Sequence, residues 1–576
     1  MSAILAAILA ALWLVGLWLA APILRGGPRV ADRLRDALVV GTAIPLVLAF
    51  AHALYWPACW IALLLCVAGA VVRHRHERGF REPIPYLLIG ALAFAAWPAL
   101  VRPLLDGDTL SYHLPNAAAW AHAHSIWTTQ TRYWWYPPAS ELFASALYTV
   151  STPFALGWSG FGALALLGWR LFAWGREGAL LPVRLADALA AAVVVILPFC
   201  IQAGSLQNDV WLAAFFVEVL WSAPVDDVTV LRAAAMCALI KPDGWIYAAV
   251  ALAASVAKPR AWLAAAGAAL LWIVHDAVLW HGAFVPPAST AFPHLWNSTM
   301  LAHPLATLEY GVAASAKFAP FGFLLILAAL ASPRLARDAP LARAGIAAAL
   351  VALVMPFGYA SASAQLATGA SLRYFAPAMA VGALVLAPHL LRLPKLALRL
   401  LLAAIAGEAL MLLLIYGNDR VTLWAPVAAL LVPFAVAFAR RANARLALAA
   451  AFACAIVVTT FLATRTTTHF YADALAVRGV RSGVYAWMAR EKPARIAGWG
   501  LRIGTAAVLS PATTAVDVPD ADPCGHARRA NALLVAVAES SHSDRFNRLR
   551  IHDAALCGKS VYRDAIAIVV DPRAAP

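Results

Sequence analysis

Long apolar runs, many of them close to the thickness of a bilayer, follow one another through the first 465 residues of the chain. A hydrocarbon core of about 30 Å requires about 20 apolar residues in a helix. The runs therefore predict membrane-spanning helices, and the shorter runs predict kinked or partial helices sheltered by protein. They cover residues 2–24, 37–54, 57–72, 84–101, 157–174, 185–203, 210–223, 229–240, 244–257, 261–279, 318–332, 344–360, 374–391, 400–416, 421–439 and 446–463.

The composition supports this fold class. The 576 residues are 63% hydrophobic and only 13% charged, which a water-soluble globule of this length would not normally show. We expect an all-α polytopic membrane protein with about 13–16 transmembrane helices. The formal net charge of +15 does not indicate a nucleic-acid partner, because the basic residues form small clusters between apolar runs. The expected surroundings are membrane lipids.

The Lys and Arg clusters predict which side of the membrane each turn faces. The first run has arginines after it and none before it, which predicts an external N-terminus and a retained first span. Alternating sides then place three polar segments, 102–156, 280–317 and 466–576, on the extracytoplasmic face. The cytoplasmic face receives clusters that include Arg29, Arg176, Arg334 and Arg392, and the other face keeps the isolated residues Arg102, Arg132, Lys241, Lys317, Arg373 and Arg420.

The character of the sequence changes after the last apolar run. Short β-like runs, "RIAGWG", "TAVDV", "LLVAVA" and "AIAIVV", alternate with helix-compatible stretches such as "RGVRSGVYAWMAR". We expect a small extracytoplasmic α/β domain over 466–576, after a membrane domain over 1–465. Cys524 and Cys557 both lie in this region and could pair if it faces the oxidising side of the membrane.

The stretch "LLDGDTLSYHLPNAAAW", residues 104–120, sets two carboxylates where an apolar run ends. If it winds into a helix, Asp108 and Tyr112 share a face, with His113 beside them and Asp106 one step upstream. A carboxylate here could simply cap the helix N-terminus, but that alternative accounts less well for two acids than for one. The loop is therefore a candidate functional site.

Other polar residues are expected to reach the same membrane surface from distant parts of the chain. The aromatics of "RYWWYPPASELF" could form an interfacial belt, or a sugar platform beside an arginine. A charge at a single span end is often a snorkelling anchor, whereas convergence of several on one surface indicates function. The set comprises Arg132, Tyr133 and Glu141 in that stretch, Asn208 and Asp209 in "SLQNDVW", Lys241 in "LIKPDGW", and Arg373 and Tyr374 in "ASLRYFAP".

These stretches resemble the GT-C superfamily of membrane glycosyltransferases, which contains protein O-mannosyltransferases and the aminoarabinose transferase acting on lipid A. That family carries an acidic motif, Asp-Glu-x-x-Tyr, in its first large external loop. Asp108 and Tyr112 keep this spacing, whereas Thr109 stands in place of the second acid. The resemblance covers residues from about 84 to 391, where the other quoted stretches are similar to those of bacterial members.

The resemblance implies transfer of a sugar from a polyprenyl-phosphate donor to a lipid, glycan or protein acceptor at the outer face of the bacterial cytoplasmic membrane. A single displacement would invert the anomeric centre. The lipid phosphate needs cations, which favours Arg132, Lys241 and Arg373. The acceptor hydroxyl needs a base, for which Asp108 is the first candidate and Asp106 the second. The expected substrate-binding residues are Tyr112, His113, Tyr133, Glu141, Asn208, Asp209 and Tyr374.

Several alternatives stay open at this point. A phosphate-activated donor requires no cofactor, but Asp106, Asp108 and His113 could also hold a divalent metal. A transporter or flippase would instead place its ionisable groups near mid-bilayer. A glycan ligase would act on the same face with a pyrophosphate-linked donor.

Overall fold

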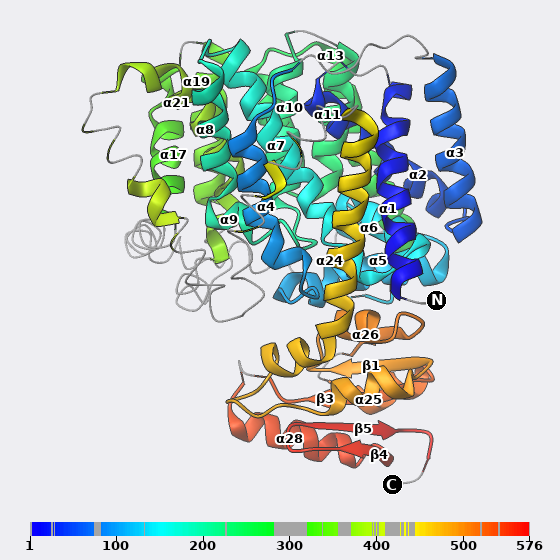
Figure 1. The fold of residues 1–576 in the computed structure, drawn as a ribbon. Coiled ribbons are helices and arrows are strands. Elements are labelled where there is room, and N and C mark those ends of the chain that lie inside the picture. The colour runs from blue at the N-terminus through cyan, green and yellow to red at the C-terminus, as the bar shows by residue number, and fades with distance from the viewer. Residues whose placement is uncertain are drawn as a thin grey trace.

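A bundle of helices stands on a small C-terminal sheet in the computed structural model (Figure 1). We call the end of the bundle that faces this sheet, residues 495–571, the sheet end, and the opposite end the far end. The N-terminus lies at the sheet end. The structure describes residues 3–24, 27, 29–73, 82–131, 133–224, 227–280, 319–336, 338–354, 370–393, 444–518, 521–539 and 542–574 and, between 394 and 443, only 396, 399, 403–408, 410, 427, 431–433 and 436.

The predicted apolar runs form helices throughout these described residues. Among them, four helices are long and apolar enough to cross a membrane, and shorter apolar helices lie between them. The runs 400–416 and 421–439 lie largely outside the described residues. The helices of the bundle are α1 (Ala3–Ala20), η1 (Ala21–Leu24), α2 (Val30–Phe50), α3 (Trp56–Arg73), α4 (Tyr86–Leu100), α7 (Trp158–Glu177), α8 (Val183–Val194), α9 (Leu197–Cys200), α10 (Asp209–Ser222), α11 (Asp227–Ile240), α12 (Gly244–Ala254), α13 (Pro259–Leu279), α17 (Pro320–Leu330), α18 (Ser332–Leu335), α19 (Ala339–Val354), α21 (Ala376–Leu386), η6 (Ala387–Arg392) and α24 (Ala444–Ala474).

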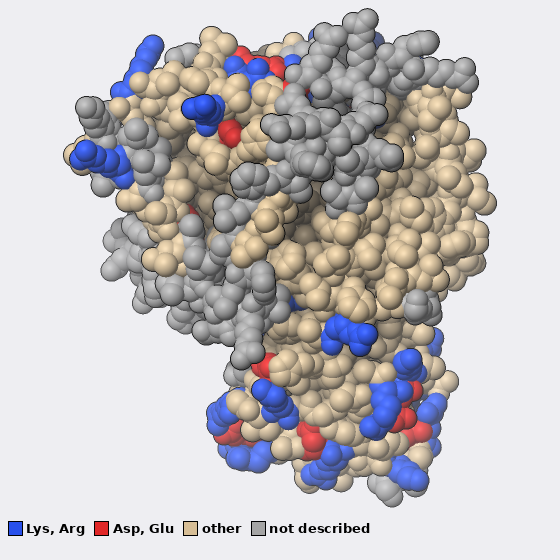
Figure 2. Space-filling view, viewed as in Figure 1, with Lys and Arg blue, Asp and Glu red and all other residues tan. Residues whose placement is uncertain are grey.

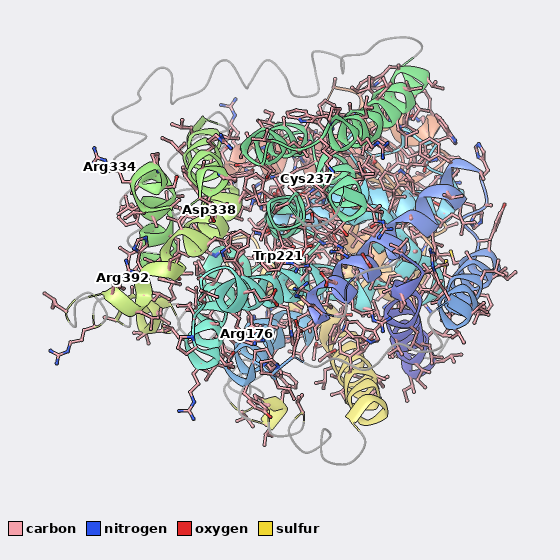
Figure 3. The ribbon with its side chains drawn as sticks, turned by 90° about the horizontal axis from the view of Figure 1, so that it is seen from above. Arg176, Trp221, Cys237, Arg334, Asp338 and Arg392 are labelled. Carbon is pink, nitrogen blue, oxygen red and sulfur yellow. A yellow bond between two sulfur atoms is a disulfide. The ribbon has the colours of Figure 1, made fainter. Side chains whose placement is uncertain are left out.

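The far end of the bundle collects basic side chains that the sequence assigns to the cytoplasmic face. Arg176 lies in the last turn of α7, Arg334 in α18, and Arg392 at the end of η6. Figure 2 shows Lys and Arg side chains at this end, and Figure 3, which views the bundle from it, labels all three arginines. The positive-inside pattern therefore separates the two ends of the bundle as expected.

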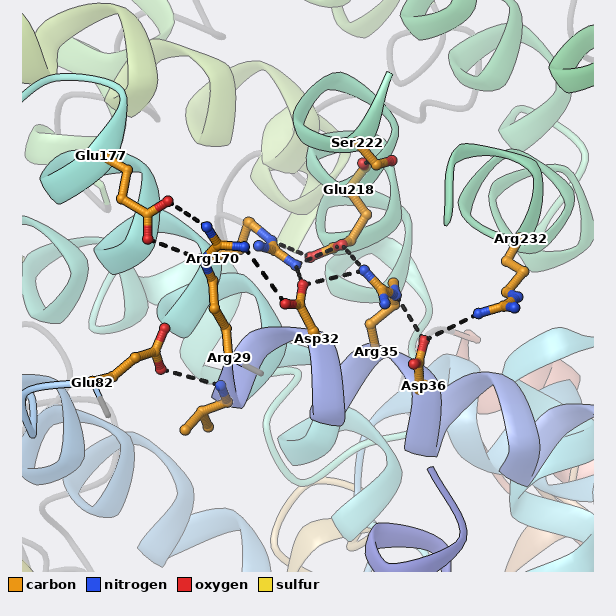
Figure 4. A network of polar contacts seen from close by, with 11 residues as sticks. Arg29, Asp32, Arg35, Asp36, Glu82, Arg170, Glu177, Glu218, Ser222 and Arg232 are labelled. Atoms are coloured by element: carbon orange, nitrogen blue, oxygen red, sulfur yellow. Dashed lines mark hydrogen bonds and ion pairs between the residues drawn. The ribbon is translucent and has the colours of Figure 1, made fainter. Parts of the chain in front are cut away.

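A buried network of opposite charges joins the helices near the far end (Figure 4). At its centre, the fully buried Arg170 of α7 donates from Nε to Glu218 Oε1 of α10 over 2.5 Å and from Nη2 to Asp32 Oδ1 of α2 over 2.7 Å. Buried charges are tolerated only when they are paired in this way. The sequence by itself does not predict this network. Its other members include Arg29, Arg35, Asp36, Glu177 and Arg232.

The C-terminal sheet has the strand order β2-β1-β3-β5-β4. β1 pairs in parallel with β2 and β3, whereas β5 is antiparallel to β3 and β4. Cys524 and Cys557 form a disulfide, as the sequence allowed. The four predicted β-like runs are strands, but β4 was missed because this edge strand is mostly exposed and polar. The elements are α25 (Val484–Glu491), β1 (Arg495–Trp499), α26 (Gly504–Leu509), β2 (Thr514–Asp517), α27 (Pro523–Arg529), β3 (Leu533–Val537), α28 (Asp544–Ala555), β4 (Lys559–Arg563) and β5 (Ala567–Asp571).

The last helix of the bundle is longer than its apolar run. α24 continues to Ala474, so it crosses the domain boundary expected at 465. The hydroxyls of Thr464 and Thr467 donate to backbone carbonyls one turn earlier, over 2.8 and 2.6 Å, so the helix itself satisfies these polar groups. Conversely, the helix predicted within 478–490 begins only at Val484, because Arg478 and Gly479 adopt positive φ angles.

The C-terminal region packs directly against the segment that follows the acidic loop. This segment forms the π-helix η2 (Thr109–His113) and then α5 (Leu114–Ala123), and α6 (Ala139–Val150) lies beside it. A Cβ atom placed on Gly504 would lie only 2.7 Å from the Leu110 carbonyl oxygen, so the two backbones touch. The Tyr148 hydroxyl and His122 Nε2 both donate to the Pro511 carbonyl, over 2.9 and 2.7 Å. The sheet is therefore held against the candidate site.

Candidate functional site

The acidic loop uses its two carboxylates differently. Asp106 Oδ1 accepts hydrogen bonds from the Thr109 backbone N–H over 2.8 Å and from Gln207 Nε2 over 3.2 Å. Asp108 occupies the N-cap position of η2, yet its side chain accepts no capping bond. Asp106 is thus the acid that caps the helix N-terminus, and the Asp108 carboxylate remains able to bind another group. Single π-turns such as η2 are frequent at functional sites.

Asp108 begins a chain of alternating charges that joins four segments distant from one another in the sequence. It pairs with Arg373, whose Nε lies 3.5 Å from Asp209 Oδ2. Asp209 pairs in turn with Lys241, and Lys241 Nζ lies 3.1 Å from Asp243 Oδ2. The structure therefore brings together four of the predicted site residues at the sheet end of the bundle. Asp243, quoted within "LIKPDGW" but given no role by the sequence analysis, is a fifth member of the chain.

Helix ends position this chain of charges. α10 begins at Asp209 and α11 ends just before Lys241, and Asn208 Nδ2 ties the two ends together by donating to the Ile240 carbonyl over 3.0 Å. The short helix η5 (Ala370–Phe375) carries Arg373 and Tyr374. Lys241 Nζ and Arg373 Cζ lie 5.2 and 5.0 Å from the centroid of the Tyr374 ring, which is cation–π distance.

Tyr112 and its neighbours form the aromatic side of the site. Its ring lies 5.0 Å from the Tyr133 ring and 5.6 Å from that of Tyr136, measured between centroids. His113 and Glu141 are buried, and His113 Nδ1 lies 2.5 Å from Glu141 Oε1. The contact with Glu141 therefore holds His113, the neighbour of Tyr112, in place from within the protein.

The segment that carries Tyr133 is anchored from α13. Trp272 Nε1 donates to the Trp135 carbonyl over 2.8 Å, and His275 Nε2 lies 3.2 Å from the Ile126 carbonyl oxygen. Trp134 and Trp135 are each only 7% exposed, so they do not form the interfacial belt that the sequence left open. Trp272 and His275 were missed because they lie in an apolar run without a recognisable motif. Arg132, predicted as a phosphate-binding residue, lies outside the described residues.

The electrostatics of the site are dominated by carboxylates. Within the described residues, three carboxylates, those of Asp108, Asp209 and Asp243, pair with the two cations Lys241 and Arg373, and Asp106 lies next to them in the loop. Burial raises the pKa of Asp106, although hydrogen bonds from Thr109 oppose this. Among the residues that the structure describes, no group of three or more His, Cys, Asp or Glu side chains is arranged to hold a metal ion.

The chain therefore folds as an apolar helical bundle, with an acidic loop at one end and an α/β unit packed against that loop. Its fold is similar to that of ArnT from Cupriavidus metallidurans in a crystal structure bound to undecaprenyl phosphate. That match has a TM-score of 0.51 and 16% identity, and covers 85% of this chain and 98% of that chain. The apo structure of ArnT from the same organism has a TM-score of 0.47, with 16% identity and the same coverage. No protein-family profile and no curated protein matches the chain.

The comparison confirms the fold class expected from the sequence. At 16% identity it bears on the fold alone, and the roles of the individual residues follow from chemistry rather than from the likeness.

Proposed function

We propose that the protein is an inverting glycosyltransferase that moves a sugar from a polyprenyl-phosphate donor to an acceptor at the extracytoplasmic face of the bacterial cytoplasmic membrane. The observation that carries this proposal is the chain of alternating charges from Asp108 to Lys241 at the sheet end of an apolar bundle. The similar ArnT structure holds undecaprenyl phosphate, which supports a polyprenyl-linked donor. In this proposal, residues 1–465 hold the reaction and residues 466–576 cover it.

Two observations support placing the sheet end outside the cytoplasm. Basic residues such as Arg176 and Arg392 gather at the far end of the bundle, and cytoplasmic turns of membrane proteins carry such an excess of Lys and Arg. The disulfide between Cys524 and Cys557 lies in the C-terminal region, and disulfides persist on the oxidising side of the membrane.

Arg373 and Lys241 are the proposed partners of the donor phosphate, together with Arg132. Their side chains are 12% and 9% exposed, so a phosphate bound there would be largely withdrawn from water and would interact strongly with them. Both cations are held in place by Asp209, which fixes them before the substrate arrives. The donor phosphate would then compete with Asp108 for Arg373.

Asp108 is the proposed general base. Its side chain is 34% exposed, whereas Asp106 is occupied by its hydrogen bonds to Thr109 and Gln207. Donor binding to Arg373 would release the Asp108 carboxylate from its ion pair, so that it can accept the proton of the acceptor hydroxyl.

The proposed reaction is one displacement at the anomeric carbon. The acceptor oxygen forms a bond to that carbon while its proton passes to Asp108. The bond between the carbon and the phosphate oxygen breaks, and its electron pair stays on the leaving polyprenyl phosphate, whose charge Arg373 and Lys241 stabilise. Tyr112, Tyr133 and Tyr374 supply aromatic faces for the sugar, and His113, Glu141, Asn208 and Asp209 hold the site together. The scheme includes no metal or cofactor, and activity in the presence of EDTA tests that part of it.

The test in cells compares the wild type with Asp108→Asn. Mass spectrometry of surface glycans and lipid-linked sugars should show that one sugar is lost from the surface while its lipid carrier accumulates. Asp338→Asn is the matched control, because Asp338 is an exposed acid at the far end and should have no effect (Figure 3). Unchanged glycans and carriers in Asp108→Asn would contradict the proposal.

A second test separates transfer from transport. Purified protein is supplied with a synthetic short-chain prenyl-phosphate sugar and a panel of acceptors in detergent. Release of prenyl phosphate together with an inverted glycoside is the expected result. No turnover with any acceptor, combined with movement of the lipid between the leaflets of vesicles, would favour a flippase instead.

A further inference from the structure

A basic side chain of the C-terminal region reaches the acidic loop. Arg502 lies between β1 and α26, two residues after Gly500, which has a φ angle of 73°. A Cβ atom placed on Gly107 would lie 3.7 Å from both Cζ and Nη2 of Arg502. Since Gly107 separates Asp106 from Asp108, the guanidinium stands directly over the backbone that links the two acids.

The position of Arg502 is fixed by the packing around it. Its carbonyl accepts a hydrogen bond from the Thr505 backbone N–H over 2.9 Å, which starts the turn into α26. Two residues further on, Gly504 touches the backbone of Leu110 in η2, where there is no space for a Cβ atom. The same interface is held by the hydroxyl of Tyr148, which donates to the Ala507 carbonyl over 3.1 Å. Arg502 is thus presented to the loop by a rigid contact.

The charge of Arg502 is available to a ligand. In the part of the chain that the structure describes, its guanidinium makes no hydrogen bond or ion pair, and the residue is exposed. Arg373 and Lys241, in contrast, are both paired with carboxylates. In the chain of alternating charges, three carboxylates, those of Asp108, Asp209 and Asp243, face the two cations, so a substrate phosphate would add to an excess of negative charge. One more cation beside the loop would offset part of that excess.

We propose that Arg502 is a substrate-binding residue, whose guanidinium binds an anionic oxygen, phosphate or carboxylate, of a substrate lying over Gly107. This inference rests on the proposed function and extends it, because the C-terminal region then completes the site as well as covering it. The anionic group belongs either to the donor phosphate or to the acceptor. Arginine suits either source, since its planar fork binds phosphate and carboxylate with two parallel hydrogen bonds.

The experiment measures binding by the full-length protein in neutral detergent at low ionic strength. Farnesyl phosphate is the probe for the donor, and inorganic phosphate is the probe for a free anionic group. Arg502→Gln should weaken binding of at least one probe about tenfold, which is the loss expected for a charge-assisted hydrogen bond, and Arg502→Lys should restore part of it. Arg490→Gln is the matched control, because Arg490 is 72% exposed on α25 and pairs only with Glu491 among the described residues. It should bind both probes as the wild type does.

The two probes distinguish the sources. Weaker binding of farnesyl phosphate, with or without weaker binding of inorganic phosphate, assigns Arg502 to the donor, and weaker binding of inorganic phosphate alone assigns it to an anionic acceptor. Unchanged affinity for both probes in Arg502→Gln, or no binding of either probe by the wild type, would overturn the inference. The measurement needs no sugar transfer, so a protein that binds through Arg502 but never transfers a sugar contradicts only the proposed function. A protein that transfers sugar while Arg502→Gln binds normally contradicts only this inference.

Discussion

Replacing Arg170 by methionine removes the centre of the buried charge network at the far end of the bundle (Figure 4). The wild-type side chain makes three hydrogen bonds to carboxylate oxygens, two to Glu218 over 2.5 and 3.0 Å and one to Asp32 over 2.7 Å. Methionine fills a similar volume but leaves both acids buried. Arg35 is the nearest remaining cation, at 3.3 Å from Asp32 and 3.4 Å from Glu218, and can compensate only in part.

The expected cost follows from these contacts. Each charge-assisted bond contributes about 1.5–3 kcal/mol, and removing one partner of a buried pair costs about 3–5 kcal/mol when the other charge stays buried. We therefore expect Arg170→Met to lower the free energy of unfolding by about 3–5 kcal/mol. The double variant Arg170→Met/Glu218→Gln should lose less than the sum of the two single variants, because it removes the stranded charge together with its partner.

The assay is reversible unfolding in mixed micelles, followed by tryptophan fluorescence. Arg176→Met is the matched control on the same helix, since this arginine lies in the last turn of α7 outside the network, and it should change stability by less than about 0.5 kcal/mol. An effect of Arg170→Met no larger than that of Arg176→Met would refute the reasoning. A double variant that loses as much free energy of unfolding as the two single variants together would refute it as well.

Three further outcomes are expected. Gly504→Ala should reduce sugar transfer by about tenfold or more, because the new Cβ would lie 2.7 Å from the Leu110 carbonyl oxygen, while the C-terminal sheet itself stays folded. Normal activity would show that the contact does not matter. The pKa of Asp564, which burial would raise, is held below its usual value by hydrogen bonds from Ser482 and Tyr562, so its ionised form stabilises the C-terminal region above pH of about 4 and this stability is lost as the pH falls further. Unfolding of the wild type and Asp564→Asn between pH 3 and 7 should show a weaker pH dependence in the variant, and equal slopes would contradict this. Alkaline phosphatase fused after the last residue should be active in bacteria, since it folds only after export; an inactive fusion that is present at normal levels would place the sheet end in the cytoplasm.

The sequence indicates which residues reach one end of the bundle, but it does not indicate which of them contact each other. Asp108 and Arg373 were selected because both terminate apolar runs on the same predicted face, a property that each segment reveals by itself. Which of the two acids caps η2 could not be predicted, because Asp106 is held partly by Gln207, a residue 101 positions away. Arg170 was overlooked for a related reason, since its acidic partners lie in α2 and α10 and nothing in its own segment identifies them.

In the C-terminal region too, the sequence predicts some elements and misses others. Its buried strands were predicted from local runs of apolar residues, whereas the exposed strand β4 and the continuation of α24 to Ala474 were not. A polar stretch joins a sheet edge only when a neighbouring strand supplies the hydrogen bonds, and that neighbour is fixed by tertiary packing.

What the sequence by itself determined is the membrane-spanning character of the chain and the end of the bundle at which its acids and isolated cations gather, because hydrophobic length and charge bias act segment by segment in a bilayer. The tertiary structure alone decided which charges meet. Asp108 and Arg373 are 265 residues apart, and an ion pair over that separation depends on how α4, α10, α11 and α21 pack together. Coulomb attraction acts only over short distances in a screened medium, so the fold, and not the order of residues, selects the partners.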